Sequence, residues 1–383
     1  MEIQESDKGK KWKRVLLIAI LVIASVLAAT FASRLRAFSG YDLENTIKQT
    51  SAASFRYISF RGNTVRYGKD GAACTDEEGK VQWNRSFEMQ DPMAEVCQTY
   101  LIIYDREGTE IDLLSEDGKA EKITTSYPIT RAVVSAKGSV YALMQDKGTA
   151  HIEVYQSSGK KAADGEIHMN KGGYPLSIAV SPDGSRLMIS MVSIIKGSIG
   201  TTIQFYDFGS SGKNKVDNIV GTFQYKGTII PEIGFSDKKK AVAIGTDRII
   251  IYSSGNSPRE SKQLKPTGSM KSVFLNDKNF GYIAEEKNTK DKKNTVENTI
   301  EMYSFSGMHK YRKTVPITYE KAYLNENNEL TLRNSSEVYI FSTFGSVRFH
   351  HEFSENVYDF IAGKTRRSFV LVSEDKIESI RLH

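Results

Sequence analysis

The histidines, which are among the residues best able to do chemistry, are few and scattered along the sequence. No two of them occur in the H-E-x-x-H spacing that binds zinc on a helix. His350 and His351 are adjacent in an expected strand, where neighbouring side chains point to opposite faces. Because metal ligands must converge on one point, we expect surface histidines and no metal site. The six are His151, His168, His309, His350, His351 and His383.

Other catalytic signatures are missing from the sequence as well. There is no G-x-S-x-G nucleophile elbow and no Walker phosphate loop. Carboxylates recur near expected strand ends, at Asp105, Glu107, Asp146 and Asp247. They could form an acidic rim that binds cations or basic partners, but Asp is common in turns, so solvated turn residues are the favoured interpretation. We therefore predict no catalytic residues and no cofactor, and a protein that is not an enzyme.

The two cysteines, Cys74 and Cys97, allow at most one disulfide bond. Free cysteine is among the most frequently buried residue types. Two buried thiols are therefore the favoured interpretation, and a single bridge stays open.

Two insertions between expected strands are the best candidates for recognition, because loops on a rigid scaffold commonly carry binding residues. The first is an apolar loop over residues 194–200, and the second is a charged loop over residues 285–298. The apolar tip could contact a protein or a membrane, or it could fold back onto its own blade. The candidate contact residues are Ile194, Ile195, Lys196, Ile199, Lys290, Lys292 and Lys293.

The elements that must position these loops follow from an internal repeat. An apolar residue, two variable residues and then Tyr, Leu or Phe precede a turn that contains glycine. The turn glycines recur every 38–53 residues, close to the period of a four-stranded propeller blade. Glycine suits such turns because they often need positive φ. The seven glycines are Gly79, Gly118, Gly159, Gly212, Gly255, Gly307 and Gly345.

Each complete repeat contains four strand-like runs, which predicts an all-β β-propeller over residues 42–383. The last repeat has only three such runs, and an unpaired edge promotes aggregation. Residues 42–50 could supply the missing strand and close the ring. This scheme gives eight blades, and seven is the alternative if the faint first repeat is misread.

Residues 15–33 are 19 residues without a charge, which as a helix would span roughly 28 Å, about the thickness of a bilayer core. A cleaved signal peptide is the alternative, but its apolar core is usually shorter and ends in a small-x-small site. Basic residues concentrate before this segment, which predicts a cytoplasmic tail over residues 1–14 and an extracytoplasmic C-terminal domain. Residues 34–41 would be the linker, and the protein would lie in the cell membrane as a single-pass signal-anchor protein.

The net charge of +6 is concentrated near the N-terminus. Residues 1–36 contain seven basic and three acidic residues, which leaves only +2 for the rest of the chain. Nucleic-acid binding would need a basic stripe on the folded part. We therefore expect no nucleic-acid partner.

Two segments resemble known propeller families. Residues 179–187 (AVSPDGSRL) resemble the turn of TolB-like and YVTN-type propellers, and residues 66–83, which end in Trp83, resemble a quinoprotein-like blade. With the N-terminal segment, the whole chain resembles a family of membrane-anchored, WD40-like propellers of clostridial Gram-positive bacteria. That resemblance implies fold and location and brings no activity. The chain departs from quinoprotein dehydrogenases because Trp83 is the only body tryptophan and no adjacent cysteine pair is present.

Three functions remain as hypotheses at this stage. The preferred one is a non-enzymatic protein-interaction scaffold at the cell envelope. The second is a ligand-sensing propeller that binds a sugar or a cell-wall fragment at its central mouth. The third is a hydrolase or lyase, which is disfavoured because no acid–base set converges in the sequence.

Overall fold

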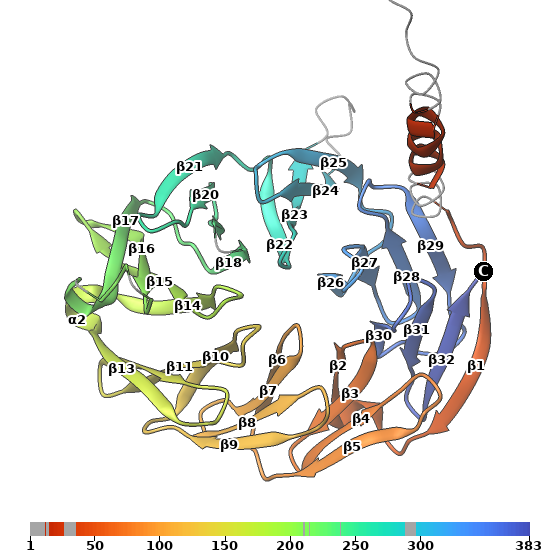
Figure 1. The fold of residues 1–383 in the computed structure, drawn as a ribbon, viewed down its shortest axis with the longest axis horizontal. Coiled ribbons are helices and arrows are strands. Elements are labelled where there is room, and N and C mark those ends of the chain that lie inside the picture. Colours follow the sequence, from red (N-terminus) through yellow and green to blue (C-terminus); the bar gives the residue numbers. More distant parts are fainter. Residues whose placement is uncertain are drawn as a thin grey trace, which may run out of the picture.

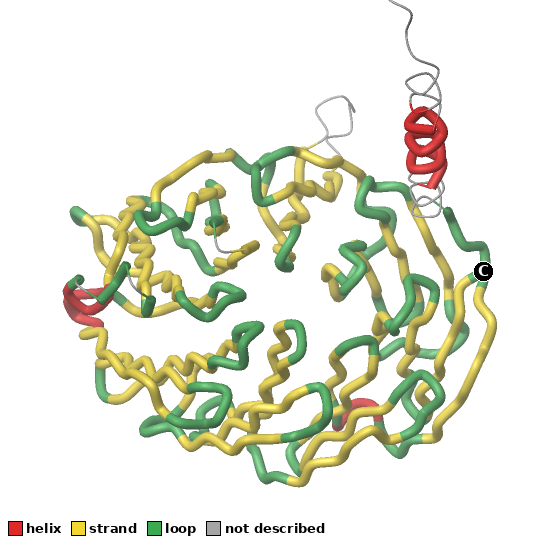
Figure 2. The backbone as a smooth tube through the Cα atoms, in the orientation of Figure 1, coloured by secondary structure: helices red, strands yellow, loops and turns green. Residues whose placement is uncertain are grey.

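The computed structural model describes Trp12 and residues 15–26, 36–209, 211–213, 215–237, 239–287 and 296–383 of the chain. Eight antiparallel four-stranded sheets form the blades of a closed ring (Figure 1). The backbone of the ring consists almost entirely of strands and turns (Figure 2). The all-β propeller with eight blades is thus confirmed, and the seven-blade alternative is wrong.

The first four blades follow one another along the chain, each running from its inner to its outer strand. Blade 1 contains β2 (Arg56–Phe60), β3 (Asn63–Gly68), β4 (Gly71–Thr75) and β5 (Val81–Ser86). Blade 2 contains β6 (Pro92–Cys97), β7 (Tyr100–Asp105), β8 (Glu110–Ser115) and β9 (Ala120–Thr124). Blade 3 contains β10 (Ile129–Val134), β11 (Val140–Asp146), β12 (Thr149–Tyr155) and β13 (Lys161–His168). Blade 4 contains β14 (Tyr174–Val180), β15 (Arg186–Ile195), β16 (Ser198–Asp207) and β17 (Ile219–Lys226).

Three further blades repeat this order, and the eighth takes its outer strand from the N-terminal side of the chain. Blade 5 contains β18 (Glu232–Asp237), β19 (Lys240–Ile244), β20 (Ile249–Ser253) and β21 (Arg259–Leu264). Blade 6 contains β22 (Ser269–Leu275), β23 (Asn279–Lys287), β24 (Val296–Ser304) and β25 (His309–Thr314). Blade 7 contains β26 (Lys321–Leu324), β27 (Leu330–Arg333), β28 (Glu337–Phe341) and β29 (Val347–Glu352). Blade 8 contains β30 (Asp359–Ala362), β31 (Ser368–Val372), β32 (Lys376–Leu382) and β1 (Tyr41–Lys48).

In the described part of the ring, helical structure is limited to three short pieces. They are η1 (Ala52–Ser54), α2 (Met169–Gly172) and η2 (Val216–Asn218). None is longer than about one turn of helix, so the blades themselves supply the core.

The hydrophobic core is divided among the interfaces between neighbouring blades. The second and third strands of a blade are apolar on both faces because each sheet packs against two others. In one cluster, Ile102 and Leu113 of blade 2 pack against Ala142 and Met144 of blade 3. The outer strands face solvent on most positions, as in β21, where five of the six residues are exposed.

The ring closes between β1 and β32, which pair antiparallel from Tyr41–Leu382 to Lys48–Lys376. The repeat pattern predicted a closing strand over residues 42–50, and the observed strand spans Tyr41–Lys48. A strand near one end of the body thereby completes the sheet at the other end. β32 is therefore paired on both sides, with β31 and with β1.

The two faces of the ring carry different turns, because every blade is a simple meander. One face, here called the hairpin face, carries the turns between second and third strands and the connections between blades. Backbone hydrogen bonds join these two kinds of segment, for example from Glu107 N–H to Ile129 O (2.8 Å) and from Val315 N–H to Asn298 O (2.8 Å). The opposite face, here called the terminal face, carries the first-to-second and third-to-fourth turns, and the chain arrives at β1 on this side.

The repeat glycines lie in the third-to-fourth turns, on the terminal face. Gly118 has φ 77°, and a Cβ there would lie 2.8 Å from the side chain of Trp83 in the preceding blade. Gly345 has φ 82°, and its Cβ would lie 2.6 Å from Tyr311, again in the preceding blade. These glycines therefore serve both the turn and the contact between blades.

Residues 15–26 form a helix. Among the described residues, no helix is long and apolar enough to cross a membrane. Part of the expected segment 15–33, residues 27–33, lies outside the described residues.

Candidate functional site: two long hairpins and the ring centre

The hairpin of β15 and β16 presents an apolar pair at its tip. Lys196 and Gly197 form the turn with φ values of 48° and 78°, a conformation that suits two-residue hairpin turns. Ile194 and Ile199 are paired across the hairpin and are 70% and 55% exposed. Their side chains therefore lie side by side on one face of the hairpin. Ile195, in contrast, is buried, so the tip turns one isoleucine inward and two outward.

The hairpin of β23 and β24 has a charged base. Arg312 of the outer strand binds Glu286 at 2.5 Å, and Thr299 donates a hydrogen bond to the same carboxylate at 2.9 Å. Burial opposes ionisation of Glu286, but the hydrogen bonds it receives, including those from Thr299 and Arg312, outweigh burial and lower its pKa. An ion pair between Arg312 and Glu286 therefore attaches the lower part of this hairpin to the outer strand β25. The expected contacts Lys290, Lys292 and Lys293 lie outside the described residues.

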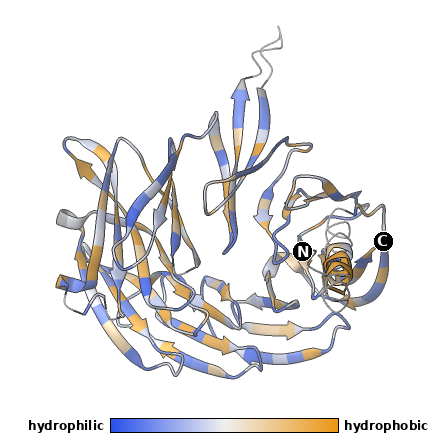
Figure 3. Ribbon diagram, turned by 45° about the horizontal axis from the view of Figure 1, so that its top comes forward, coloured by the Kyte–Doolittle hydropathy of each residue, from blue (hydrophilic) through white to orange (hydrophobic). Residues whose placement is uncertain are grey.

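Both long hairpins project from the same face of the ring. Each joins the second and third strands of its blade, so each belongs to the hairpin face. Figure 3 shows the β23–β24 hairpin rising from the ring, with hydrophilic segments along it. The sequence marked two separate insertions, and the fold brings them to one side, in blades 4 and 6.

The ring centre holds a polar set that the sequence analysis missed. Arg131 of β10 lies 3.9 Å from the Glu95 carboxylate of β6 and donates a hydrogen bond to Ser177 of β14 at 3.1 Å. It also lowers the pKa of Glu232 of β18, two blades away. The sequence could have pointed to this set only through the single polar residue on each of several inner strands. Such residues are common on strands, so they do not mark a site.

The electrostatics of this set raise the pKa of both carboxyl groups. Burial raises the pKa of Glu95, and Glu232 raises it further, while Arg131 lowers it. Burial also raises the pKa of Glu232, again against the influence of Arg131. One guanidinium thus lowers the pKa of two carboxyl groups. None of these residues is an activated nucleophile.

A pocket of about 480 Å³ opens on the hairpin face, where the inner strands of blades 7, 8 and 1 begin. Its charged groups have partners: Lys321 binds Asp359 at 3.0 Å, and Arg56 binds Asp91 at 3.0 Å. The Tyr57 hydroxyl donates to Gln49 at 2.7 Å. Aromatic rings beside charged side chains that already form ion pairs suit a flat, polar ligand. The lining residues are Ala52, Ala53, Phe55, Arg56, Tyr57, Tyr67, Lys321, Tyr358 and Asp359.

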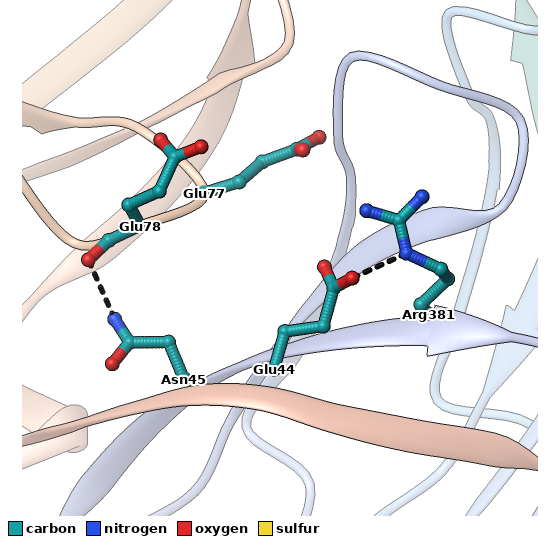
Figure 4. Close-up of a pocket in the computed structure, with 5 residues that line it drawn as sticks. All are labelled: Glu44, Asn45, Glu77, Glu78 and Arg381. Carbon is teal, nitrogen blue, oxygen red and sulfur yellow. Dashed lines mark hydrogen bonds and ion pairs between the residues drawn. The ribbon is translucent and has the colours of Figure 1, made fainter.

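A second pocket, of about 350 Å³, lies at the seam between blades 8 and 1 (Figure 4). Asn45 donates a hydrogen bond to the Glu78 carbonyl at 2.8 Å, and Glu44 forms an ion pair with Arg381. Glu77, which also lines the pocket, accepts a hydrogen bond from the backbone N–H of Lys364 at 2.7 Å. These polar contacts hold the closing strand to its neighbours. The residues of this pocket therefore serve ring closure, and we do not assign them a binding role.

The histidines and carboxylates singled out in the sequence do not converge. His309 binds Glu301 at 2.6 Å, and His350 binds Glu337 at 2.7 Å, in different blades. Asp105, the last residue of β7, is buried and accepts hydrogen bonds from the backbone N–H groups of Gln90 and Asp91, so it is not the solvated turn residue that the sequence favoured. Among the described residues, no group of three or more His, Cys, Asp or Glu side chains is placed to hold a metal ion.

The two cysteines are unbridged, with Cys74 buried and Cys97 partly buried. Burial raises the pKa of the Cys74 thiol to about 12 and that of the Cys97 thiol to about 11. Both thiols are therefore protonated near neutral pH. Protonated thiols are poor nucleophiles, so neither cysteine is activated for chemistry.

The fold and its two faces define the class of this protein: an eight-bladed β-propeller. Residues 34–382 match the model of a family described as "Family of unknown function (DUF5711)". The chain belongs to this family. No curated protein matches the sequence.

Several solved propellers are similar to this chain. Raptor from Chaetomium thermophilum aligns with a TM-score of 0.50 at 9% identity, over 93% of this chain and 30% of that one. BamB from Moraxella catarrhalis aligns with a TM-score of 0.49 at 9% identity, over 89% of this chain and 100% of that one. The Swd1 propeller of Myceliophteria thermophila aligns with a TM-score of 0.49 at 10% identity, over 90% and 100%. At such identities the likeness concerns the fold alone.

Proposed function

We propose that this protein is a membrane-anchored, extracytoplasmic propeller that acts as a non-enzymatic protein-interaction scaffold. The observation that carries the proposal is the placement of both long hairpins on one face, with the exposed Ile194–Ile199 pair at one tip. An adjacent apolar pair on a rigid hairpin offers contact area that needs little ordering on binding. The expected partner is a protein of the cell envelope that docks on the hairpin face.

The proposed location follows from the uncharged segment 15–33 and the basic residues before it. The positive-inside rule favours a cytoplasmic N-terminus and a propeller on the outer side. Alkaline extraction of membranes from expressing cells tests the anchor. A chain released like a peripheral protein would contradict it.

The scaffold function is tested with a photo-crosslinking residue at Lys196 in the full chain, expressed in its own cells. We expect one dominant crosslinked protein, and we expect Ile194→Ser/Ile199→Ser to abolish the adduct. The unfolding midpoint should stay nearly constant, because exposed substitutions usually change stability by less than about 0.5 kcal/mol.

Val216→Ser is the matched control, because Val216 is 83% exposed and lies between the third and fourth strands of blade 4, on the terminal face. It should leave the adduct unchanged. An adduct of equal yield in the double isoleucine variant would show that the hairpin is not the contact.

A second candidate function, ligand sensing, is favoured by the pocket of about 480 Å³ on the hairpin face. Phe55, Tyr57 and Tyr358 line it beside Arg56 and Lys321, which suits a sugar or a cell-wall fragment. Specific binding to the folded state raises the melting temperature. A thermal shift with envelope saccharides that disappears in Tyr358→Ala would support this function, and no shift with any fragment would reject it.

A further inference from the structure

The segment that enters the propeller from the N-terminal side is fixed to the terminal face at residues 38–40. The backbone N–H of Phe38 donates to Arg348 O at 2.6 Å, and Ser39 N–H donates to His383 O at 2.9 Å. The Phe38 ring is buried and lies 4.8 Å from the Arg348 guanidinium. The Arg367 guanidinium lies 5.7 Å from the same ring. The chain is therefore attached to blades 7 and 8 before β1 begins.

This attachment leaves a short tether. Four residues lie between Phe38 and Ser33, where the proposed membrane segment ends, so five Cα–Cα steps join the two. At ~3.5 Å per extended residue they span at most about 17 Å. A propeller held on so short a tether cannot turn freely above a membrane.

The surface around this attachment has the chemistry of a membrane-contacting face. Met308, Phe344 and Val347 are 61%, 49% and 42% exposed, and all three lie at the third-to-fourth turns of blades 6 and 7 on the terminal face. Lys364 and Arg367 are exposed in the first-to-second turn of blade 8, on the same face. Exposed apolar side chains beside basic ones suit the interface of an anionic bilayer.

We propose that the terminal face at blades 6 to 8 lies against the phospholipid headgroups, and that the hairpin face points away from the membrane. The inference rests on the proposed anchor and adds an orientation to it. Tether length, attachment at Phe38 and surface chemistry all favour the same side. A partner on the hairpin face would then approach from outside and not from the lipid.

The experiment uses the full chain in nanodiscs of phosphatidylcholine and phosphatidylglycerol that carry a headgroup-attached quencher. A fluorescent amino acid replaces either Glu326, exposed in the first-to-second turn of blade 7, or Lys147, exposed in the second-to-third turn of blade 3. We expect strong quenching at position 326 and little at position 147. Equal quenching at the two positions would overturn the proposed orientation.

Two variants distinguish the effect of the short tether on the orientation from the effect of the basic turn. A flexible insert of about 20 Gly and Ser residues after Ser33, with a mean span of roughly 25 Å, should remove much of the difference between the labels. Lys364→Glu should weaken quenching at position 326 in the anionic nanodiscs and not in phosphatidylcholine alone, while the control Lys271→Glu on an inner strand should not. If neither variant changes the quenching, the short tether and the basic turn do not orient the propeller.

Failure of this orientation is distinguishable from failure of the anchor. A chain that does not co-purify with the nanodiscs contradicts the proposed anchor itself. A chain that co-purifies but is quenched equally on both faces keeps the anchor and refutes the orientation.

Discussion

The guanidinium of Arg348 and the carboxylate of Glu329 form an ion pair in which the two side chains are only 2% and 1% exposed. Arg366 of blade 8 binds the same carboxylate oxygen at 2.8 Å. Arg348 also lies over the Phe38 ring, so this pair connects blade 7, blade 8 and the segment that precedes β1. Burial lowers the pKa of Arg348, and the Glu329 carboxylate opposes that effect.

Glu329→Gln should be strongly destabilising, because it leaves Arg348 as a buried charge without its counter-charge. Breaking a buried pair on one side typically costs about 3–5 kcal/mol. Urea unfolding followed by tryptophan fluorescence measures the change. Glu326→Gln, at an exposed position three residues earlier, is the control and should change the free energy of unfolding by less than about 0.5 kcal/mol. Equal stability of the two variants would show that the pair does not hold blades 7 and 8 together.

Gly345→Ala should destabilise the propeller more than Gly159→Ala. Both glycines occupy third-to-fourth turns with positive φ, 82° and 75°, so both substitutions carry a backbone cost of roughly 1–2 kcal/mol. A Cβ at Gly345 would meet Tyr311 at 2.6 Å, whereas at Gly159 the nearest atom is 3.6 Å away. The difference between the two free energies of unfolding isolates the contact between blades. Identical losses would mean that only the turn conformation requires glycine.

Stability should depend on pH through Glu153. Burial opposes its ionisation, but hydrogen bonds from Lys161 (2.7 Å), Ser126 (2.6 Å) and Tyr155 (2.5 Å) outweigh burial and lower its pKa to about 2. A lowered pKa in the folded state stabilises the fold above the ordinary value near 4.5, and this contribution is lost as the pH falls towards 2. The contribution is on the order of 2–3 kcal/mol.

The measurement is the free energy of unfolding against pH for the wild type and Glu153→Gln. We expect the variant to be less stable at pH 6 and the gap to narrow between about pH 4.5 and 2. A gap that stays constant over this range would mean that the Glu153 charge does not contribute.

Arg131→Met should raise the pKa of both Glu95 and Glu232 further, because it removes the guanidinium that lowers them. A carboxyl group with a raised pKa in the folded state stabilises the fold at low pH and loses that contribution as the pH rises through the folded-state pKa. The variant should therefore be less stable than the wild type near pH 8, with a smaller deficit near pH 4. Carbon-detected NMR titration of the glutamate carboxyls measures the shift directly. Arg131→Lys keeps the charge and should shift both values less, and an unchanged titration in Arg131→Met would contradict the shared guanidinium.

Much of the ring was predictable because its signals are local. The turn glycines recur in blades 1 to 7 beside strand-like runs, and the three-stranded last repeat required a strand from elsewhere. The structure places β1 (Tyr41–Lys48) there. The repeat pattern, however, attributed the glycines to turn conformation alone. That Gly118 and Gly345 also pack against Trp83 and Tyr311 of the preceding blades depends on how two sheets meet, which no single repeat encodes.

The candidate sites were less predictable, because they too depend on how separate strands and sheets meet. An apolar run such as residues 194–200 does not tell which isoleucine faces water, because that depends on the hairpin register that pairs Ile194 with Ile199. Glu95, Arg131 and Glu232 are separated by 36 and 101 residues, and only the closed ring brings their strands to one centre.

The sequence by itself determined the architecture of this protein. Each four-stranded repeat must bury both faces of its sheet, and a closed ring gives every sheet a neighbour on each side. The tertiary structure alone decided the geometry of function: both long hairpins on one face, the chain attached through Phe38 on the other, and charges shared across the centre. Local patterns specify which residues are buried, whereas the relative positions of distant residues arise only when the ring closes.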